Sequence, residues 1–315
     1  MPSSTSNSEV RAKARSYTGP IAWTLIAIVL ILCGFEASIR IGFSRVSRIE
    51  SRTFSDHTAA LAVRHRADSR PSILLLGNSL LLEGIDYDRL RAGLEPAAMP
   101  TRFVIEQTAW LDWYYGIRRL FAEGSRPDRI VLCLNIDQLV SDRLLGDYAA
   151  FYLIQTSDLA EAGSAAGYSL TRISSLFFAR YSLGFAGLTN FRNFALNKVA
   201  PSYGGALHEI RAMARAQGEK NTNVLARAGV RLARLQSLCA EFHTRCDILV
   251  PPALVPQGES EERELVEAGK KAGTTILIPV PVNAWGREMY GDGFHLTPAA
   301  AVSFTDLVAT ALLRQ

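Results

Sequence analysis

Short apolar runs alternate with stretches of helical periodicity over most of this 315-residue chain, and this alternation constrains its fold more than any other feature. The runs expected as strands are residues 72–76, 102–106, 129–134, 247–250 and 274–278. Apolar residues at helical spacing follow them, over 111–123, 223–243, 259–272 and 298–314. The first run is almost continuously apolar, which is typical of a strand covered on both faces. The pattern predicts an α/β fold with a parallel sheet and helices on both sides.

Two polar segments follow strands of this predicted sheet. Gly77-Asn78-Ser79-Leu80 comes after the first run and puts a serine at the start of a helix. Asp292-Gly293-Phe294-His295 lies in the loop after the fifth run. Because the carboxyl ends of parallel strands share one edge of a sheet, the two segments can meet there.

The three polar residues of these segments match the needs of a serine nucleophile. A serine hydroxyl requires a base to take its proton and an acidic group to orient that base. We therefore expect Ser79 to be the nucleophile, His295 the general base and Asp292 the orienting carboxylate. The structural alternatives are a helix cap for Ser79, a structural histidine for His295 and a cap or turn residue for Asp292.

The same segments carry a resemblance to a known family. Gly77-Asn78-Ser79-Leu80 resembles the GDSL block of the SGNH hydrolase superfamily, with Asn in the Asp position, and Asp292-Gly293-Phe294-His295 is similar to its DxxH block. The continuation from Leu80 to Asp86 resembles the membrane-anchored branch acting on cell-wall polymers and exopolysaccharides, such as alginate O-acetyltransferases. The resemblance covers roughly residues 72–315 and is thin over 151–221. It implies a flavodoxin-like three-layer sandwich with a five-stranded parallel sheet, preceded by one N-terminal transmembrane helix, and a reaction without a cofactor or metal.

The resemblance is weaker where an oxyanion would be stabilised. The second block of the superfamily carries a Gly after the second strand, but this chain reads Gln107-Thr108-Ala109-Trp110. The third block is usually G-x-N-D, and Leu134-Asn135-Ile136-Asp137 offers Asn135 as a side-chain donor, or as a capping residue. Gln107 and Trp110 stand where a substrate could lie. Aromatic faces suit sugar rings, although aromatic residues at helical spacing also fit a core.

The N-terminal region predicts a membrane anchor. Residues 21–35 are apolar apart from Thr24 and Gly34, and extension to Ile41 reaches the ~20 residues that span a bilayer. A cleaved signal peptide and a buried helix are the alternatives. The basic flank of Arg11, Lys13 and Arg15 places the N-terminus in the cytoplasm. We expect a disordered cytoplasmic tail (1–19), a signal anchor (20–41), a juxtamembrane linker and helix (42–70) and an SGNH-like domain (71–315).

Two further features of the domain leave alternatives open. Residues 151–221 interrupt the strand–helix alternation and are expected to be a helical insert, either packed on the domain or forming a lid or membrane-facing cap. Cys239 and Cys246 flank a helix end and the next strand, so they form a disulfide or remain two buried thiols.

These features together favour an exported enzyme. The 34 basic and 30 acidic residues are too balanced to argue for nucleic acid, and the sequence has no Zn-type Cys pairs and no Gly-rich phosphate loop. We expect a serine esterase or O-acyltransferase on the outer side of the inner membrane, acting on acetyl groups of an exopolysaccharide or cell-envelope glycan. A membrane acyltransferase or polysaccharide synthase complex is the expected protein partner. The alternative is a catalytically degenerate SGNH-fold scaffold of a polysaccharide synthesis or export complex.

Overall fold

A five-stranded parallel sheet forms the centre of the computed structural model, which describes residues 7–65, 70–95, 97–189, 223–253 and 259–314 with a few positions between 190 and 200. Its order is β2-β1-β3-β4-β5, from β1 (Ser72–Gly77), β2 (Met99–Val104), β3 (Arg129–Cys133), β4 (Arg245–Leu249) and β5 (Thr275–Leu277). This is a flavodoxin-like order, so the predicted fold class is confirmed. Strand β2 begins three residues earlier than predicted, because Met99–Val104 pairs residue for residue with Ser72–Gly77.

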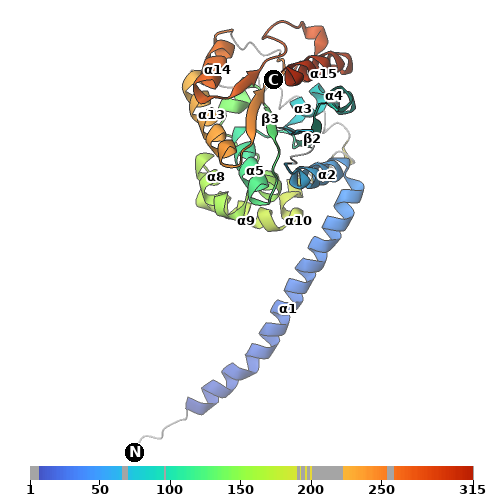
Figure 1. Ribbon diagram of the computed structural model, residues 1–315. Helices are drawn as coiled ribbons and strands as arrows, with labels where there is room; N and C mark the ends of the chain where they lie inside the picture. The colour runs from blue at the N-terminus through green and yellow to red at the C-terminus, as the bar shows by residue number, and fades with distance from the viewer. Residues whose placement is uncertain are drawn as a thin grey trace, which may run out of the picture.

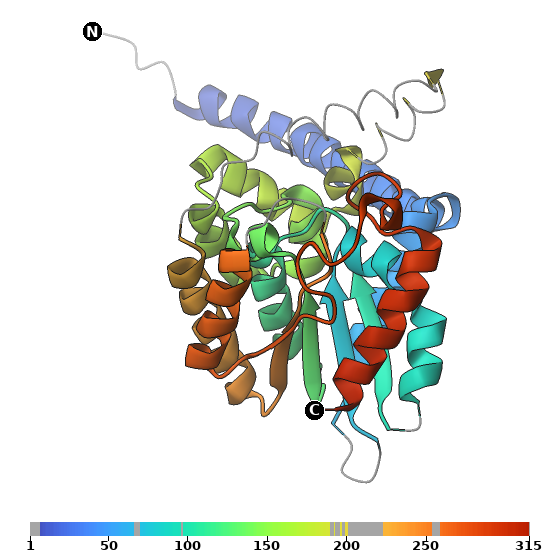
Figure 2. The ribbon, with the colours of Figure 1, turned by 90° about the horizontal axis from the view of Figure 1, so that it is seen from above.

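Helices cover both faces of the sheet (Figure 2), and alternate residues of β1 are buried in two separate cores. Ile73 and Leu75 join the core under α3 (Ser79–Gly84), α4 (Tyr87–Leu94) and α15 (Pro298–Leu313). Leu74 and Leu76 join the larger core under α5 (Trp110–Ala122), α13 (Val224–Glu241) and α14 (Glu259–Ala272). Successive side chains of β1 point to opposite faces of the sheet, and helices cover both faces. The fold therefore has three layers, with the sheet between two layers of helices.

The described part of the predicted insert is helical. Short helices follow β3: α6 (Ile136–Val140), α7 (Asp147–Leu153), the 3₁₀ turn Thr156–Asp158, α8 (Leu159–Ala165), α9 (Leu170–Tyr181) and α10 (Leu183–Ala186). Helix α7 packs on α5, and α9 and α10 pack on α7. The part of the insert from 201 to 221 lies outside the described residues.

The N-terminal helix α1 (Asn7–Val46) extends away from the domain, and α2 (Arg48–Ala62) packs on the edge strand β2 (Figure 1). Its segment Gly19–Gly42 is long and apolar enough to cross a membrane, with a mean hydropathy of 2.1. None of that segment is buried, so the alternative of a buried helix is wrong. Disorder was predicted for residues 1–19, but from Asn7 onward they are helical. They extend a helix that already exists, which avoids the cost of nucleation.

The cysteine pair links two core elements. Cys239 near the end of α13 and Cys246 in β4 form a disulfide with their Cα atoms 6.2 Å apart, so the disulfide alternative is confirmed. Cys133 in β3 is a free, buried thiol whose pKa is raised by burial.

Candidate active site

The end of strand β1 is shaped so that Ser79 begins a helix at the carboxyl edge of the sheet. Gly77 closes the strand, and a Cβ there would lie 2.9 Å from the carbonyl oxygen of Cys133 on the neighbouring strand. Any side chain would therefore push β1 and β3 apart. The chain then turns through Asn78, the N-cap residue, and Ser79 is the first residue of α3.

Asn78 joins the nucleophile turn to the loop after β2. Its Oδ1 accepts a hydrogen bond from the backbone N–H of Leu80 at 3.0 Å, and its Nδ2 donates to the carbonyl oxygen of Thr108 at 2.9 Å. The side chain is fully buried. The second bond requires a donor, which an ionised aspartate does not have. An asparagine at position 78 is therefore matched to this loop.

The loop that carries Asp292 and His295 is closed on itself before α15 begins. Tyr290 and Leu296 form an antiparallel bridge, and Gly291 N–H donates to the carbonyl oxygen of His295 at 2.9 Å. Gly293 at the tip has φ +81°, a left-handed conformation that favours glycine. Thr297 then caps α15. This hairpin-like closure holds His295 in place without a neighbouring strand.

The structure brings Ser79, His295 and Asp292 into one chain of hydrogen bonds. His295 Nε2 lies 2.9 Å from Ser79 Oγ, and Nδ1 lies 2.8 Å from Asp292 Oδ2. The other oxygen of Asp292 accepts backbone N–H groups of Phe294 and His295 at 2.9 and 2.7 Å. Burial opposes ionisation of this carboxyl, but these bonds outweigh it and lower the pKa of Asp292 to about 2. An ionised Asp292 fixes the ring so that Nε2 faces the serine.

Glu83 is a second carboxylate beside His295 that the sequence reasoning did not assign. Its Oε2 lies 3.7 Å from His295 Nδ1, and its side chain is half exposed. Glu83 stands four residues after Ser79 on α3, so the two side chains share one helix face. The four-residue spacing between Ser79 and Glu83 was the sequence signal from which Glu83 could have been predicted. A positive imidazolium formed during proton transfer would have both carboxylates beside its Nδ1.

The two predicted oxyanion positions lie at the same edge of the sheet as Ser79. Gly77 is in register with Val104 and Cys133, so the segments after β1, β2 and β3 begin at one level. Asn135 is the N-cap residue of α6, and its Oδ1 accepts from Gln138 N–H at 2.8 Å. Among the described residues, nothing accepts a hydrogen bond from its Nδ2. Asn135 therefore caps a helix and still has amide hydrogens to offer.

Gln107 occupies a backbone conformation that favours glycine. Its φ is +65°, in the left-handed region, at the place where the superfamily's second block carries a Gly. Its side chain is exposed, and its carbonyl oxygen accepts from Arg143 Nη2 at 3.1 Å. Within the described ranges, its backbone N–H has no acceptor. The loop after β2 thus holds a left-handed backbone conformation at a glutamine.

Asp112 holds this loop against its neighbour. One carboxylate oxygen accepts Ala109 N–H and the other accepts Leu145 N–H, both at 2.9 Å. Complete burial raises the pKa of Asp112 to about 7, although both hydrogen bonds favour the ionised form.

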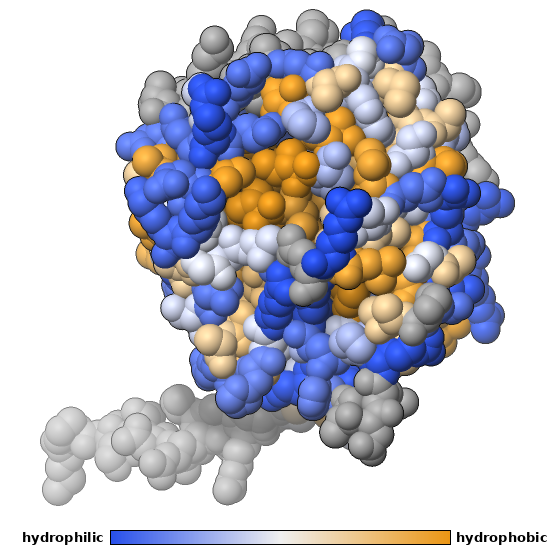
Figure 3. All heavy atoms as spheres, turned by 45° about the horizontal axis from the view of Figure 1, so that its top comes forward, coloured by the Kyte–Doolittle hydropathy of each residue, from blue (hydrophilic) through white to orange (hydrophobic). Residues whose placement is uncertain are grey.

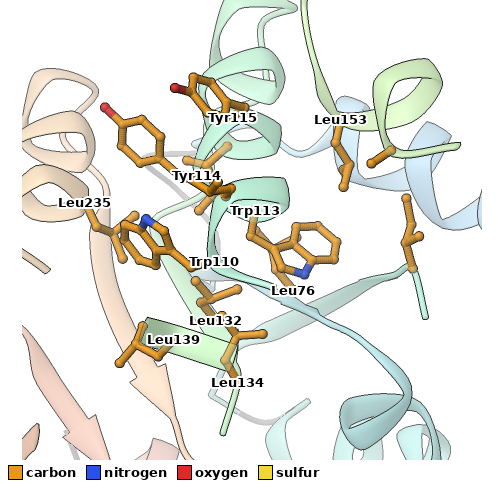
Figure 4. Close-up of a cluster of buried hydrophobic side chains, with 14 of the residues drawn as sticks. Leu76, Trp110, Trp113, Tyr114, Tyr115, Leu132, Leu134, Leu139, Leu153 and Leu235 are labelled. Carbon is orange, nitrogen blue, oxygen red and sulfur yellow. The ribbon is translucent and has the colours of Figure 1, made fainter. Parts of the chain in front are cut away.

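The predicted sugar-binding role of Trp110 is wrong. Trp110 is 1% exposed and belongs to the core between α5 and the sheet, where Leu132, Leu134 and Leu235 surround it (Figure 4). Its ring stacks on Tyr114 at a centroid distance of 5.8 Å. The apolar residues at helical spacing in this segment therefore form a core helix, with no ring face left for a sugar. Gln107, the other residue predicted to contact substrate, has an exposed side chain.

Hydrophobic patches on the face in Figure 3 are bordered by hydrophilic side chains. In the part of the chain that the structure describes, no group of three or more His, Cys, Asp or Glu side chains is placed to hold a metal ion.

No family model and no curated protein matches this chain. Its fold is similar to the crystal structure of LAE5, an alpha/beta hydrolase enzyme from the metagenome of Lake Arreo, Spain, at 11% identity and a TM-score of 0.40, over 78% of this chain and 94% of that one. It is also similar to the crystal structure of TesA, at 12% identity and a TM-score of 0.38, over 76% of this chain and 97% of that one.

Proposed function

We propose that this chain is a serine-dependent esterase or O-acyltransferase of the SGNH type, tethered to the inner membrane by α1 with its domain on the outer side. Its substrate class is acetylated exopolysaccharide or cell-envelope glycan. The observation that carries the proposal is the chain of hydrogen bonds from Ser79 Oγ through His295 to Asp292, with distances of 2.9 and 2.8 Å. A capping serine or a structural histidine needs no such partner.

The geometry supports a two-step acyl transfer. Ser79 Oγ attacks the acyl carbonyl carbon while His295 Nε2 takes the hydroxyl proton, and the ring is stabilised by Asp292. The oxyanion can be met by the backbone N–H of Ser79, because the next N–H groups of α3 already bond Asn78, together with the Gln107 N–H and Asn135 Nδ2. The tetrahedral intermediate collapses, and His295 returns the proton to the departing oxygen. Acyl-Ser79 remains.

The second step decides between esterase and transferase. A water molecule or a sugar hydroxyl attacks acyl-Ser79, again losing its proton to His295 Nε2, and Ser79 leaves with that proton. Water gives a free carboxylate, whereas a sugar hydroxyl gives an acylated glycan. The resemblance of residues 80–86 to the polysaccharide-modifying branch supports the glycan. The apolar α1 with its basic flank supports the membrane location, where a membrane acyltransferase or a polysaccharide synthase complex would supply the acyl group or the polymer.

A fluorophosphonate probe tests the proposal on the full chain in detergent. The wild type and Ser303→Ala, which alters an exposed serine on α15, should label equally, and Ser79→Ala should not label. Acetate release and acetyl transfer from 4-nitrophenyl acetate to candidate glycans, read by mass spectrometry, then separate the two acceptors. A folded wild type that neither labels nor turns over this ester would contradict the enzyme and favour the scaffold.

A further inference from the structure

Helix α1 is clamped to the domain at the end of its apolar segment. Glu36 accepts hydrogen bonds from Ser182 Oγ at 2.7 Å and from the backbone N–H groups of Leu183 and Gly184 at 2.7 and 3.2 Å. These groups form the start of α10. Arg40, one turn later, bonds Glu36 at 2.7 Å and donates to the carbonyl oxygen of Tyr181 at 3.0 Å. Hydrogen bonds of Glu36 and Arg40 thus attach α1 to the corner between α9 and α10.

Close packing reinforces this clamp. A Cβ on Gly184 would lie 2.8 Å from Ile39 Cδ1, so the end of the Ile39 side chain on α1 packs directly on Gly184 of α10. The guanidinium of Arg40 lies 5.5 Å from the ring centre of Phe151, in cation–π contact. These polar and apolar contacts hold α1 against the corner between α9 and α10. The depth of Glu36 in a membrane would therefore set the depth of that corner.

An exposed group of aromatic side chains lies on that corner, and we call it the aromatic face. It consists of Phe177, Phe178, Tyr181 and Phe185, whose side chains are between 43% and 60% exposed. Its rings contact one another, with centroid distances of 5.2 Å for Phe177–Tyr181 and 6.2 Å for Phe178–Phe185. Figure 1 shows α9 and α10 on the side of the domain from which α1 extends. The aromatic face therefore continues the apolar surface of the anchor.

The length of α1 places this face at the level of a membrane boundary. The 18 residues from Gly19 to Glu36 span about 27 Å of helix, compared with a hydrocarbon core of about 30 Å. With Gly19 near one boundary, Glu36 and Arg40 come close to the other. Aromatic side chains are enriched at this depth, because their rings suit the headgroup region.

We propose that the aromatic face is seated in the headgroup region of the bilayer beside α1, as a second membrane contact that fixes the orientation of the domain. This inference rests on the proposed membrane anchoring. A single membrane-spanning helix would let the domain rotate and tilt relative to the membrane. A second contact through the aromatic face holds the domain in one orientation. Ser79 then stays at a fixed height above the lipid surface.

Environment-sensitive labels on single cysteines test the inference in the full chain. A Cys33→Ser background removes the exposed native thiol, while Cys133 is buried and the other two cysteines are paired. Phe178→Cys carries an NBD label, and Val230→Cys, 64% exposed on α13, is the matched control. Both proteins are reconstituted in phosphatidylethanolamine–phosphatidylglycerol vesicles, with and without lipid bearing a nitroxide near the headgroup. The label at 178 should shift to the blue and lose most of its emission to the nitroxide lipid, and the label at 230 should change little.

The outcomes separate this inference from the anchoring itself. Flotation of the vesicles after alkaline carbonate washing reports whether α1 is inserted. Protein that fails to float overturns the anchoring and the inference together. Protein that floats while the label at 178 stays unquenched and fully hydrated overturns the inference alone, and leaves the aromatic face to a protein partner.

Discussion

Asn78→Asp is the substitution that most directly probes how the nucleophile turn is held. The wild-type amide donates to the carbonyl oxygen of Thr108 at 2.9 Å inside a fully buried site. An aspartate keeps the acceptor for Leu80 N–H but presents an oxygen to the Thr108 oxygen. Leaving a buried carbonyl without its donor costs about 1–3 kcal/mol. With ~2 kcal/mol, the melting temperature of a domain of this size falls by roughly 4–8 °C.

The loss should depend on pH. The new carboxyl at position 78 can donate to Thr108 only when it is protonated, so the folded state favours the protonated form and raises the pKa of this carboxyl. Stability relative to wild type should therefore be nearly retained at acidic pH and lost as pH rises towards neutrality. Thermal unfolding of the full chain in detergent, followed by circular dichroism, measures this.

Asn223→Asp is the matched control for this experiment. Asn223 caps α13 in the same manner, accepting from Ala226 N–H at 3.1 Å, but it is exposed. An aspartate there is an equally good cap and suits the helix dipole, so stability should be unchanged or slightly higher. Equal stability of Asn78→Asp and wild type at neutral pH would refute the reasoning.

Four further outcomes follow from the structure. Asn135→Ser keeps a capping oxygen for α6 but removes the amide donor, so acyl-ester turnover should fall about a hundredfold or more with little change in melting temperature; unchanged turnover would move oxyanion stabilisation to backbone groups. Burial, with help from nearby Arg119, lowers the pKa of His57 from 6.5 to about 4, so the unfolded chain gains a proton first as pH falls. Between pH 6.5 and about 4, the free energy of unfolding of the wild type, measured by denaturation at a series of pH values, should fall by up to roughly 3 kcal/mol. The free energy of unfolding of His57→Gln should fall by less, and an equal fall in both proteins would contradict this reasoning. Replacing Cys239 and Cys246 by Ser opens a short loop and should cost about 2.5 kcal/mol, measurable with urea, whereas an unchanged midpoint would show that the disulfide does not stabilise the domain. A reporter protein fused after residue 70 should be found outside the cytoplasm, and a reporter found in the cytoplasm would rule out the anchor.

Periodicity and topology predict the sheet, its order of elements and the meeting of Ser79 with His295, because each depends on a local pattern or on the shared edge of parallel strands. Trp110 shows the limit of such reasoning. Its position in a helix is evident from spacing, but which side of that helix the core occupies depends on α13, over a hundred residues away. Glu36 is a second case, because its partners on α10 belong to a segment without periodic signal.

Gln107 illustrates a different failure. A left-handed backbone is expected at glycine, asparagine or aspartate, and glutamine gives no hint of it. The neighbouring hydrogen bonds of Asn78, Asp112 and Arg143 hold the loop in this conformation, and those partners come from three separate elements.

The hydrogen bond between Ser79 and His295 joins residues that are 216 positions apart in the sequence. A chain that emerges from its N-terminus first presents the serine long before the base exists. Until His295 is in place, the Ser79 hydroxyl is therefore an ordinary alcohol, which is a weak nucleophile. Under the proposed function, Ser79 is activated only once the loop of His295 is in place, and that loop leads into α15, which packs on α3 and α4.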